Sequence, residues 1–200
     1  MIDLYNNLVD MTGKTHQLIG FVSVYSVALV LGVGGINVQT FIACILLISL
    51  GSLTPDLDND KNRIYTLIPL GQKTFSEVFE KVFGKHRSVS HSFFGMAILG
   101  WISHWLIFKI PVENGLAHEF LWGAYMISMI SHVTADMYTR DGVPLLWPFK
   151  ITFYGIPIKP LRIRTGSWVE MVVVEGMTVL ILVGISYYYW DRVTSLVFFG

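Results

Sequence analysis

The sequence predicts an all-α protein, a polytopic membrane bundle of about five transmembrane helices in a single domain over residues 1–200. Of the 200 residues, 53% are hydrophobic and 14% are charged, whereas soluble domains usually carry about 25% charged residues. Long apolar runs alternate with polar segments, and the few ionisable residues fall at matching ends of these runs. We therefore expect lipid, rather than water, to face much of the surface.

Five apolar runs account for the expected helices. A helix needs about 20 apolar residues to cross hydrocarbon, with a range of about 17–25. The first, third and fifth runs satisfy this length, and the second and fourth are short. Gly32, Gly34 and Gly35 end the first run, which predicts a tight turn into an antiparallel hairpin. The runs are Gln17–Ile36, Gln39–Leu53, Ser92–Ile110, Phe120–Ala135 and Val169–Trp190.

The basic residues predict the orientation. If successive runs cross in alternating directions, Lys109 and Arg192 lie on one side, and the other twelve of the 14 Lys and Arg residues lie on the side of the N-terminus. Cytoplasmic loops carry an excess of Lys and Arg. We therefore expect a multi-pass protein whose N-terminus is cytoplasmic. The first fifteen residues lack the basic start and apolar core of a cleaved signal, so the first run is expected to act as the insertion signal and remain.

Metal-ligand side chains lie at the run ends that alternation places on this cytoplasmic side. His16 opens the first run, Asp56 closes the second, His91 opens the third, and His132 and Asp136 close the fourth. A helical bundle would bring these ends together on one rim. The pattern predicts a metal site at the membrane surface, with these five residues as ligands.

His132 and Asp136 form the sharpest local pair. Residues four apart share one face of a helix, so the imidazole and the carboxylate can hold one metal, or the carboxylate can bridge two. The alternative is a hydrogen-bonded His–Asp pair that stabilises a polar bundle interior. The other clusters on the same rim favour metal.

The segment after the second run carries further carboxylates. Pro55 ends the helix, and Asp56 lies nearest the membrane, so it is the preferred ligand, with Asp58 as a second candidate for the site or its catalysis. The D-x-D-x-D spacing is not a calcium loop, because Lys61 stands where that loop needs Gly and Leu67 where it needs Glu.

His86 and His91 precede the third run, and the sequence leaves open which of them is the ligand. Arg87 lies beside them. Its guanidinium is a candidate for binding a substrate phosphate through a fork of donors, and the alternative is a basic residue that only sets the membrane orientation. Further candidate anion binders are Arg140, Arg162 and Arg164.

Glu170 opens the fifth run and is a candidate further ligand or general base. The alternative is structural, because Ser167 followed three positions later by Glu170 is a capping box. Glu175 lies deeper in the same run, where an ionisable group is costly and needs a partner.

Mixed imidazole and carboxylate ligands favour zinc, as one or two ions, with manganese or iron(II) as alternatives. A bound metal lowers the pKa of its water to about 7 and polarises a phosphoryl or carbonyl oxygen, so the natural chemistry is hydrolysis. The sequence has no Ser–His–Asp order, P-loop or dinucleotide glycine fingerprint, and no basic, aromatic-interleaved surface that would indicate nucleic acid.

Several motifs resemble one known family. They are TGKTHQ around His16, GSLTPDLD ending at Asp58, HRSVSHS from His86, SHVTADMYTRDGVPLLWPF from Ser131 to Phe149, and RIRTGSWVE ending at Glu170. These are similar to motifs of the YdjM-like, LexA-regulated group of bacterial inner-membrane metal-dependent hydrolases. The ligand order also resembles, more distantly, the all-helical zinc phospholipase C and nuclease fold, which implies a phosphoester substrate by analogy.

The expected function is therefore metal-dependent hydrolysis of a phosphoester, plausibly of a lipid head group, at the cytoplasmic face of a bacterial inner membrane. The expected partner is membrane lipid, including a phospholipid substrate; the sequence does not give the oligomeric state. A rival from another class is a non-enzymatic metal-binding transporter or scaffold. A phosphatase using covalent phosphohistidine is disfavoured, because its P-S-G-H motif is absent.

Overall fold

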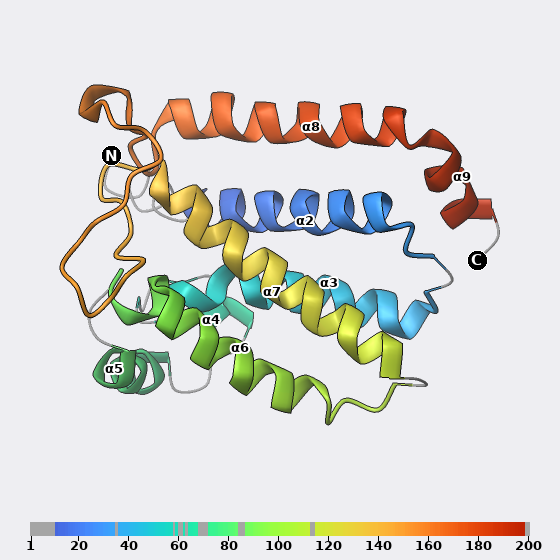
Figure 1. Cartoon of the computed structure of the whole chain (residues 1–200), viewed down its shortest axis with the longest axis horizontal. Coiled ribbons are helices and arrows are strands. Elements are labelled where there is room, and N and C mark those ends of the chain that lie inside the picture. The colour runs from blue at the N-terminus through green and yellow to red at the C-terminus, as the bar shows by residue number, and fades with distance from the viewer. Residues whose placement is uncertain are drawn as a thin grey trace.

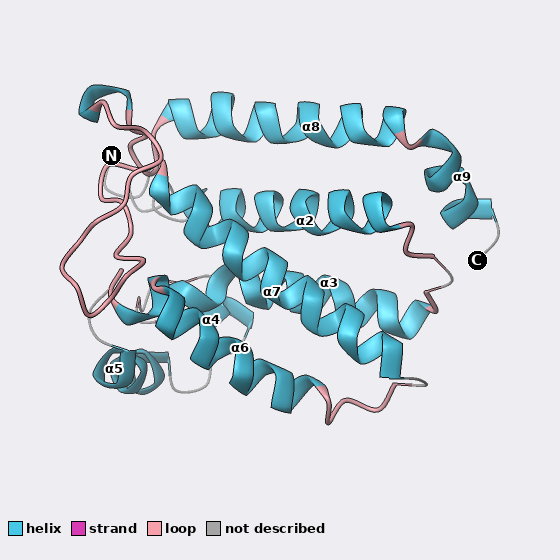
Figure 2. Cartoon of the chain, viewed as in Figure 1, coloured by secondary structure: helices cyan, strands magenta, loops and turns pink. Residues whose placement is uncertain are grey.

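The computed structural model describes residues 11–34, 36–57, 59, 62, 64–67, 72–83, 87–112 and 115–198. Over these residues the fold is all-α, as the sequence predicts, and the long helices lie side by side (Figures 1 and 2). Three apolar segments are long enough to cross a membrane, namely Gly13–Leu31, Val38–Asp56 and Glu170–Tyr188. A shorter apolar helix covers Phe93–Ile107.

The first two long helices, α2 (Met11–Leu31) and α3 (Val38–Leu53), form the expected antiparallel hairpin. Helix α2 begins earlier than the apolar run that predicts it, because its first turns include the polar residues Thr12, Lys14 and Thr15. Gly32 has a φ of +68°, a left-handed conformation suited to glycine, and it follows the last residue of α2. Asn37 begins α3 by accepting a hydrogen bond from the backbone N–H of Thr40.

Helix α7 (Gly115–Met137) crosses α2 and α3 and packs against both, while α6 (Phe93–Ile107) packs on its other side (Figure 1). Small residues allow the close approach: a Cβ at Gly51 of α3 would collide with the carbonyl oxygen of Tyr125 and the hydroxyl of Ser128. Gly20 of α2 faces the side chains of Ser52 and Ser128. In lipid, where apolar burial gives little drive, such close backbone packing holds helices together.

The main hydrophobic core lies between these helices and includes Leu47, Leu99, Leu121 and Met129. His104 lies near the end of α6, where it stacks on Phe108.

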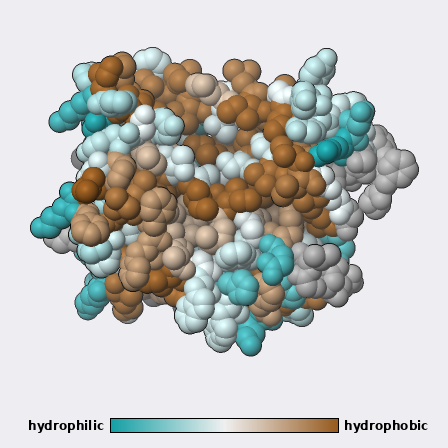
Figure 3. All heavy atoms as spheres, in the orientation of Figure 1, coloured by the Kyte–Doolittle hydropathy of each residue, from teal (hydrophilic) through white to brown (hydrophobic). Residues whose placement is uncertain are grey.

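Helix α8 (Glu175–Tyr188) lies along one edge of the bundle and contacts α2 (Figure 1). A single turn of π-helix, Glu170–Val174, precedes it. Thr178 is the buried residue of α8. The apolar side chains of this helix face outward. Figure 3 shows hydrophobic side chains across α8 and α7, with hydrophilic ones mainly toward the two ends of the helices.

The remaining elements lie at the ends of the long helices. Helices α4 (Ile64–Leu67) and α5 (Gln72–Phe83) lie at the end where α3 finishes and α6 begins, and Figure 1 shows α5 end-on, so its axis runs across the bundle. Helix α9 (Trp190–Phe198) follows α8 at the opposite end. The loop after α7 folds back on itself through the isolated bridges Thr139–Ile163 and Val143–Phe153.

Candidate metal centre

The last two turns of α7 carry the centre of the site. His132 and Asp136 lie one turn apart on the same face, and both are fully buried. His16 comes from the first turns of α2, and its ring stacks on that of His132 with 3.8 Å between the centroids. Nε2 of His16 lies 3.4 Å from Oδ1 of Asp136. The start of the first long helix and the end of α7 therefore meet, as alternating crossings predict.

Asp56 enters the site from the end of α3. Pro55 has no N–H, so the α-helix stops at Leu53 and continues as a short 3-10 turn, Thr54–Asp56. The hydroxyl of Tyr125 on α7 donates to the hydroxyl oxygen of Thr54 at 3.1 Å. The turn is thereby fixed against α7, with the Asp56 carboxylate toward His132.

His91 comes from the 3-10 turn Val89–His91, directly before α6. The hydroxyl of Ser92 caps α6 by accepting from the N–H of Gly95 at 3.1 Å. A Cβ at Gly95 would collide with the carbonyl of Val89, so glycine lets this turn fold tightly onto the helix. The His91 imidazole is buried, and its Nδ1 lies 3.1 Å from the hydroxyl of Ser90.

Four side chains from three segments converge here: Asp56, His91, His132 and Asp136, whose ligand atoms all lie within 4.8 Å of one another. Nε2 of His91 is 3.3 Å from Oδ1 of Asp56 and 3.2 Å from Oδ2 of Asp136. Nε2 of His132 is 3.4 Å from Oδ1 of Asp56. Two ligands about 2.0–2.1 Å from a tetrahedral metal lie roughly 3.3 Å apart. The spacing therefore suits four atoms that share one cation.

The unbonded atoms support the same interpretation. Nε2 of His132 and Oδ2 of Asp136 are buried and, apart from imidazole–carboxylate contacts of 3.2–3.7 Å inside the cluster, have no partner in the part of the chain that the structure describes. Buried polar atoms normally have a partner, and an exception calls for an ion, a water or a functional role. A cation between these atoms would satisfy both of them.

The orientation of His132 is set by α3. Its Nδ1 lies 2.6 Å from the backbone carbonyl oxygen of Ser52. A carbonyl only accepts, so Nδ1 carries the proton, and Nε2 presents its lone pair to the cluster. Metal-binding histidines almost always have a second hydrogen bond of this kind, which fixes the tautomer and the ring orientation.

Arg87 donates a hydrogen bond to Oδ1 of Asp136. Its Nη2 donates to Oδ1 of Asp136 at 3.0 Å, and its Nη1 donates to the hydroxyl of Thr139 at 2.7 Å. A further contact reaches Asp141 at 3.4 Å. Arg87 has a φ of +55°, unusual for a residue with a side chain. The guanidinium thus orients Asp136 and leaves Oδ2 for the cluster.

The two carboxylates also act on His91, which precedes the apolar helix. Burial lowers the pKa of His91, but hydrogen bonding and charge interaction with Asp136 and Asp56 outweigh burial and raise the pKa to about 9. Without metal the imidazole therefore holds a proton at neutral pH. A metal that binds Nε2 must displace that proton.

Glu170 lies beside the cluster. Its carboxylate accepts from the backbone N–H of Gly166 at 2.7 Å, and its own N–H lies 3.4 Å from the hydroxyl of Ser167. Ser167 thus caps the helix as the sequence suggests. The carboxylate of Glu170 accepts from the N–H of Gly166, and not from that of Ser167 as in a capping box. Glu170 is also buried and, with His16, lines a cavity of about 30 Å³, which is room for a water molecule.

Each predicted residue can now be placed. The structure brings together His16, Asp56, His91, His132 and Asp136, with Arg87 and Glu170 beside them. Asp58 and His86, the remaining predicted site residues, lie outside the described residues. Among the candidate anion binders, Arg162 donates to the carbonyl oxygens of Ile156 and Pro157, and Arg140 and Arg164 are exposed.

Three supporting groups were not predicted from the sequence. They are the Ser52 carbonyl, the Thr139 hydroxyl that bonds Arg87, and Thr15, whose hydroxyl donates to Glu175 at 2.9 Å. Thr139 lies three residues after Asp136, so helical spacing could have indicated it. A backbone carbonyl has no signal in the sequence.

Known proteins resemble the chain over most of its length. The family model for the YdjM inner membrane protein matches residues 11–194. The uncharacterized protein YvsG of Bacillus subtilis (strain 168) is 32% identical over 168 residues, which cover 84% of this chain and 90% of YvsG. The inner membrane protein YdjM of Escherichia coli (strain K12) is 34% identical over 103 residues, 50% of this chain and 47% of that protein. No solved structure matches the chain significantly.

Proposed function

The chain belongs to the YdjM inner membrane protein family, and we propose that it is a metal-dependent hydrolase whose site lies at the cytoplasmic face of the bacterial inner membrane. It is an inner membrane protein with several candidate membrane-spanning helices. The proposed substrate is a phosphoester, with a membrane lipid as the molecule that carries it.

The observation that carries this proposal is the convergence of Asp56, His91, His132 and Asp136. A pair of imidazoles with a pair of carboxylates is a donor set typical of zinc, with manganese and iron(II) as alternatives. A buried cluster of carboxylates is costly without compensating charge. One divalent cation would balance the two negative charges of Asp56 and Asp136.

A metal bound here would supply an activated water and polarise a phosphoryl oxygen. The chain's own groups do the rest. Arg87 keeps Asp136 in one orientation, and Ser52 keeps His132 in one tautomer. Asp56 has a side chain that is 21% exposed, whereas those of the other three are fully buried, so water is expected to approach from its side.

Glu170 is the proposed general base. It lies outside the four-residue cluster and lines the small cavity with His16. A carboxylate in this position can take a proton from a water held in the cavity and release it to solvent. The hydrogen bond from the N–H of Gly166 fixes one of its oxygens and leaves the other for that role.

The proposed membrane arrangement has five spans. Helices α6 and α7 would complete the set begun by the three long apolar segments. The excess of Lys and Arg at the end that carries the site favours a cytoplasmic location. An interfacial site would let the bilayer deliver a lipid head group directly.

A metal-binding scaffold or transporter is the competing function. Transport needs polar groups along a path through the membrane. In the part of the chain that the structure describes, the candidate ligands gather at one end of the helices, which favours an enzyme at a surface.

The test is hydrolysis by purified protein in lipid nanodiscs. A panel of phospholipids and isoprenoid phosphates would be incubated with protein loaded with zinc, manganese or iron(II), and released phosphate or head group would be measured. We expect turnover that a chelator abolishes, that metal restores, and that the His132→Ala variant lacks. Bound metal with no turnover on any substrate would favour the scaffold.

A further inference from the structure

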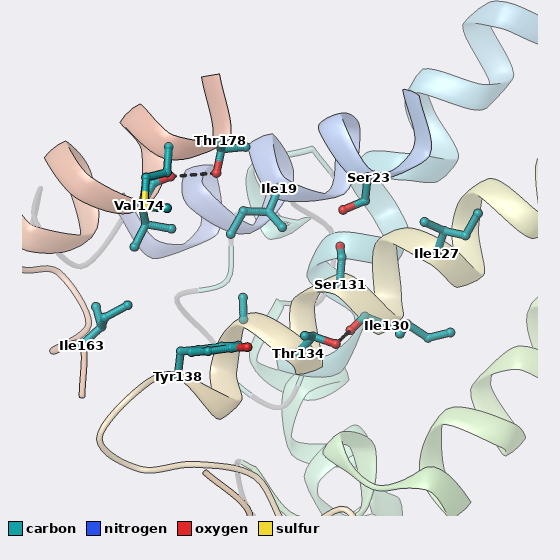
Figure 4. A pocket seen from close by; sticks show the side chains of 12 residues that line it. Ile19, Ser23, Ile127, Ile130, Ser131, Thr134, Tyr138, Ile163, Val174 and Thr178 are labelled. Atoms are coloured by element: carbon teal, nitrogen blue, oxygen red, sulfur yellow. Dashed lines mark hydrogen bonds between the residues drawn. The ribbon is translucent and has the colours of Figure 1, made fainter. Parts of the chain in front are cut away.

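A second, larger cavity opens beside the metal centre. It is a groove of about 550 Å³ between α2, α7 and α8, a volume within the range of small-molecule sites. Figure 4 shows Ile19 and Ser23 of α2 between two walls, one from α7 with Ser131 and Thr134, the other from α8 with Thr178. We call it the lipid-side groove, and it lies where α8 packs mainly against α2.

The lining of the groove is apolar in effect, even where hydroxyls occur. Ser131 donates to the carbonyl of Ser128, Thr134 to that of Ile130, and Thr178 to that of Val174. These three hydroxyls are thus bonded to their own helices, and two of the bonds appear in Figure 4. Small side chains leave the space open, while isoleucine, valine and methionine side chains form its surface. Such a lining suits a hydrocarbon and offers little to a polar ligand.

The groove adjoins a small cavity at the edge of the metal centre. Ile19, Ala135, Ile163 and Val174 line both the groove and the small cavity that contains His16 and Glu170. On each helix a groove residue lies within about one turn of a site residue: Ile19 follows His16, and Val174 follows Glu170. A molecule with its apolar part in the groove would have its polar end near His16 and Glu170.

On this basis we propose that the groove binds an acyl or isoprenoid chain of the substrate, which enters sideways from the bilayer between α7 and α8. The inference rests on the proposed hydrolase function and specifies its substrate as an amphiphile with one chain in the groove. The position of the groove next to the cavity of His16 and Glu170 favours a lipid over a helix from another protein or a second copy of this chain, because a lipid has a polar head group to place beside an apolar chain.

Photolabelling tests the occupant. Phosphatidylglycerol with a diazirine in one acyl chain would be incorporated into nanodiscs with the full-length protein, irradiated, and the labelled residues mapped by mass spectrometry. Met177 lines the groove and is 58% exposed, and Leu180 lies outside it on the same helix and is 70% exposed. The variants Met177→Trp and Leu180→Trp therefore add the same bulk inside and outside the groove.

We expect label concentrated on groove residues, a several-fold loss in Met177→Trp, and no change in Leu180→Trp. Even labelling around the outer faces of α7 and α8, or equal effects of the two variants, would overturn the proposal. So would displacement of the label by dimerisation, since a second copy would then be the occupant.

Labelling requires neither metal nor turnover, so it separates this inference from the proposed function. Groove labelling that persists in a His132→Ala protein, combined with absent hydrolysis in the wild type, would support the lipid site and reject the hydrolase. Hydrolysis without groove labelling would support the hydrolase and reject the lipid site. In an active protein, Met177→Trp should raise the KM for a long-chain lipid several-fold and leave the KM for a water-soluble phosphoester unchanged.

Discussion

Replacing Asp136 with asparagine removes one negative charge from the centre of the cluster and keeps the volume of the side chain. Oδ2 of Asp136 lies 3.2 Å from His91 and 3.7 Å from His132, and Oδ1 receives the hydrogen bond from Arg87. An amide is a poor metal ligand in a site of this kind, so the variant should bind metal through three groups instead of four.

The size of the effect follows from the ligand number. Structural zinc sites have apparent binding free energies of about 10–16 kcal/mol, so one of four ligands carries roughly 3 kcal/mol. Since about 1.4 kcal/mol is a factor of ten, the affinity of Asp136→Asn should fall by a factor on the order of 100.

The assay is metal content by mass spectrometry, followed by competition with a chelator of known affinity. The matched control is Asp141→Asn. Asp141 also contacts Arg87, at 3.4 Å, but its side chain is 75% exposed and lies outside the cluster. The metal affinity of the Asp141→Asn variant should therefore equal that of the wild type. The reasoning is refuted if the two variants bind metal equally well, or if the wild type takes up no zinc, manganese or iron.

Three further predictions follow from the site and its packing. Arg87→Gln should weaken metal binding by about 10–100-fold, as loss of a group that orients a ligand usually does; unchanged affinity by chelator competition would show that Asp136 needs no such support. Gly51→Ala should destabilise the protein by about 1–3 kcal/mol, because the added Cβ would collide with α7. The control Gly123→Ala should be neutral or stabilising, because nothing lies within 4 Å of the added Cβ. Equal melting temperatures of the two variants would contradict this prediction. The apparent metal affinity should rise about tenfold per pH unit up to the pKa of His91, about 9, and then level off; a flat profile by calorimetry would exclude His91 as a ligand.

The same proton has a consequence for the metal-free protein. The pKa of His91 lies above its ordinary value of 6.5, so the protonated imidazole stabilises the folded state. This contribution is complete below about pH 6.5 and is lost as the pH rises through about 9. Metal-loaded protein should lack this pH dependence, because its His91 holds no proton.

The sequence predicted the gathering of the ligands well, because it depends only on helix order. His16, Asp56, His91 and Asp136 lie at alternating run ends, and no detail of packing is needed to place them on one rim. The short second and fourth runs were less informative, because helix α7 continues through polar residues at both ends. The length of an apolar run therefore underestimates the length of the helix.

The supporting contacts could not be predicted, since they depend on local backbone conformation. Arg87 reaches Asp136 through a residue at positive φ, and the sequence suggested a substrate phosphate as its partner. The partner of His132 is a main-chain oxygen of Ser52, which any residue type could supply. The lipid-side groove likewise depends on how α8 packs beside α2 and α7.

The end of α3 links helix length to coordination chemistry. The last carbonyls of a helix lack partners within it, and here Ser52 accepts from His132 and Leu53 accepts from Asn62. Pro55 therefore determines two things at once: where the Asp56 carboxylate emerges, and which oxygen is left to steer the imidazole. Since each residue turns a helix by about 100°, a one-residue insertion in α3 ahead of Ser52 would rotate both the Ser52 carbonyl and the Asp56 carboxylate away from His132. The rotation of α3 about its axis thus sets the positions of two groups of the candidate metal centre at once.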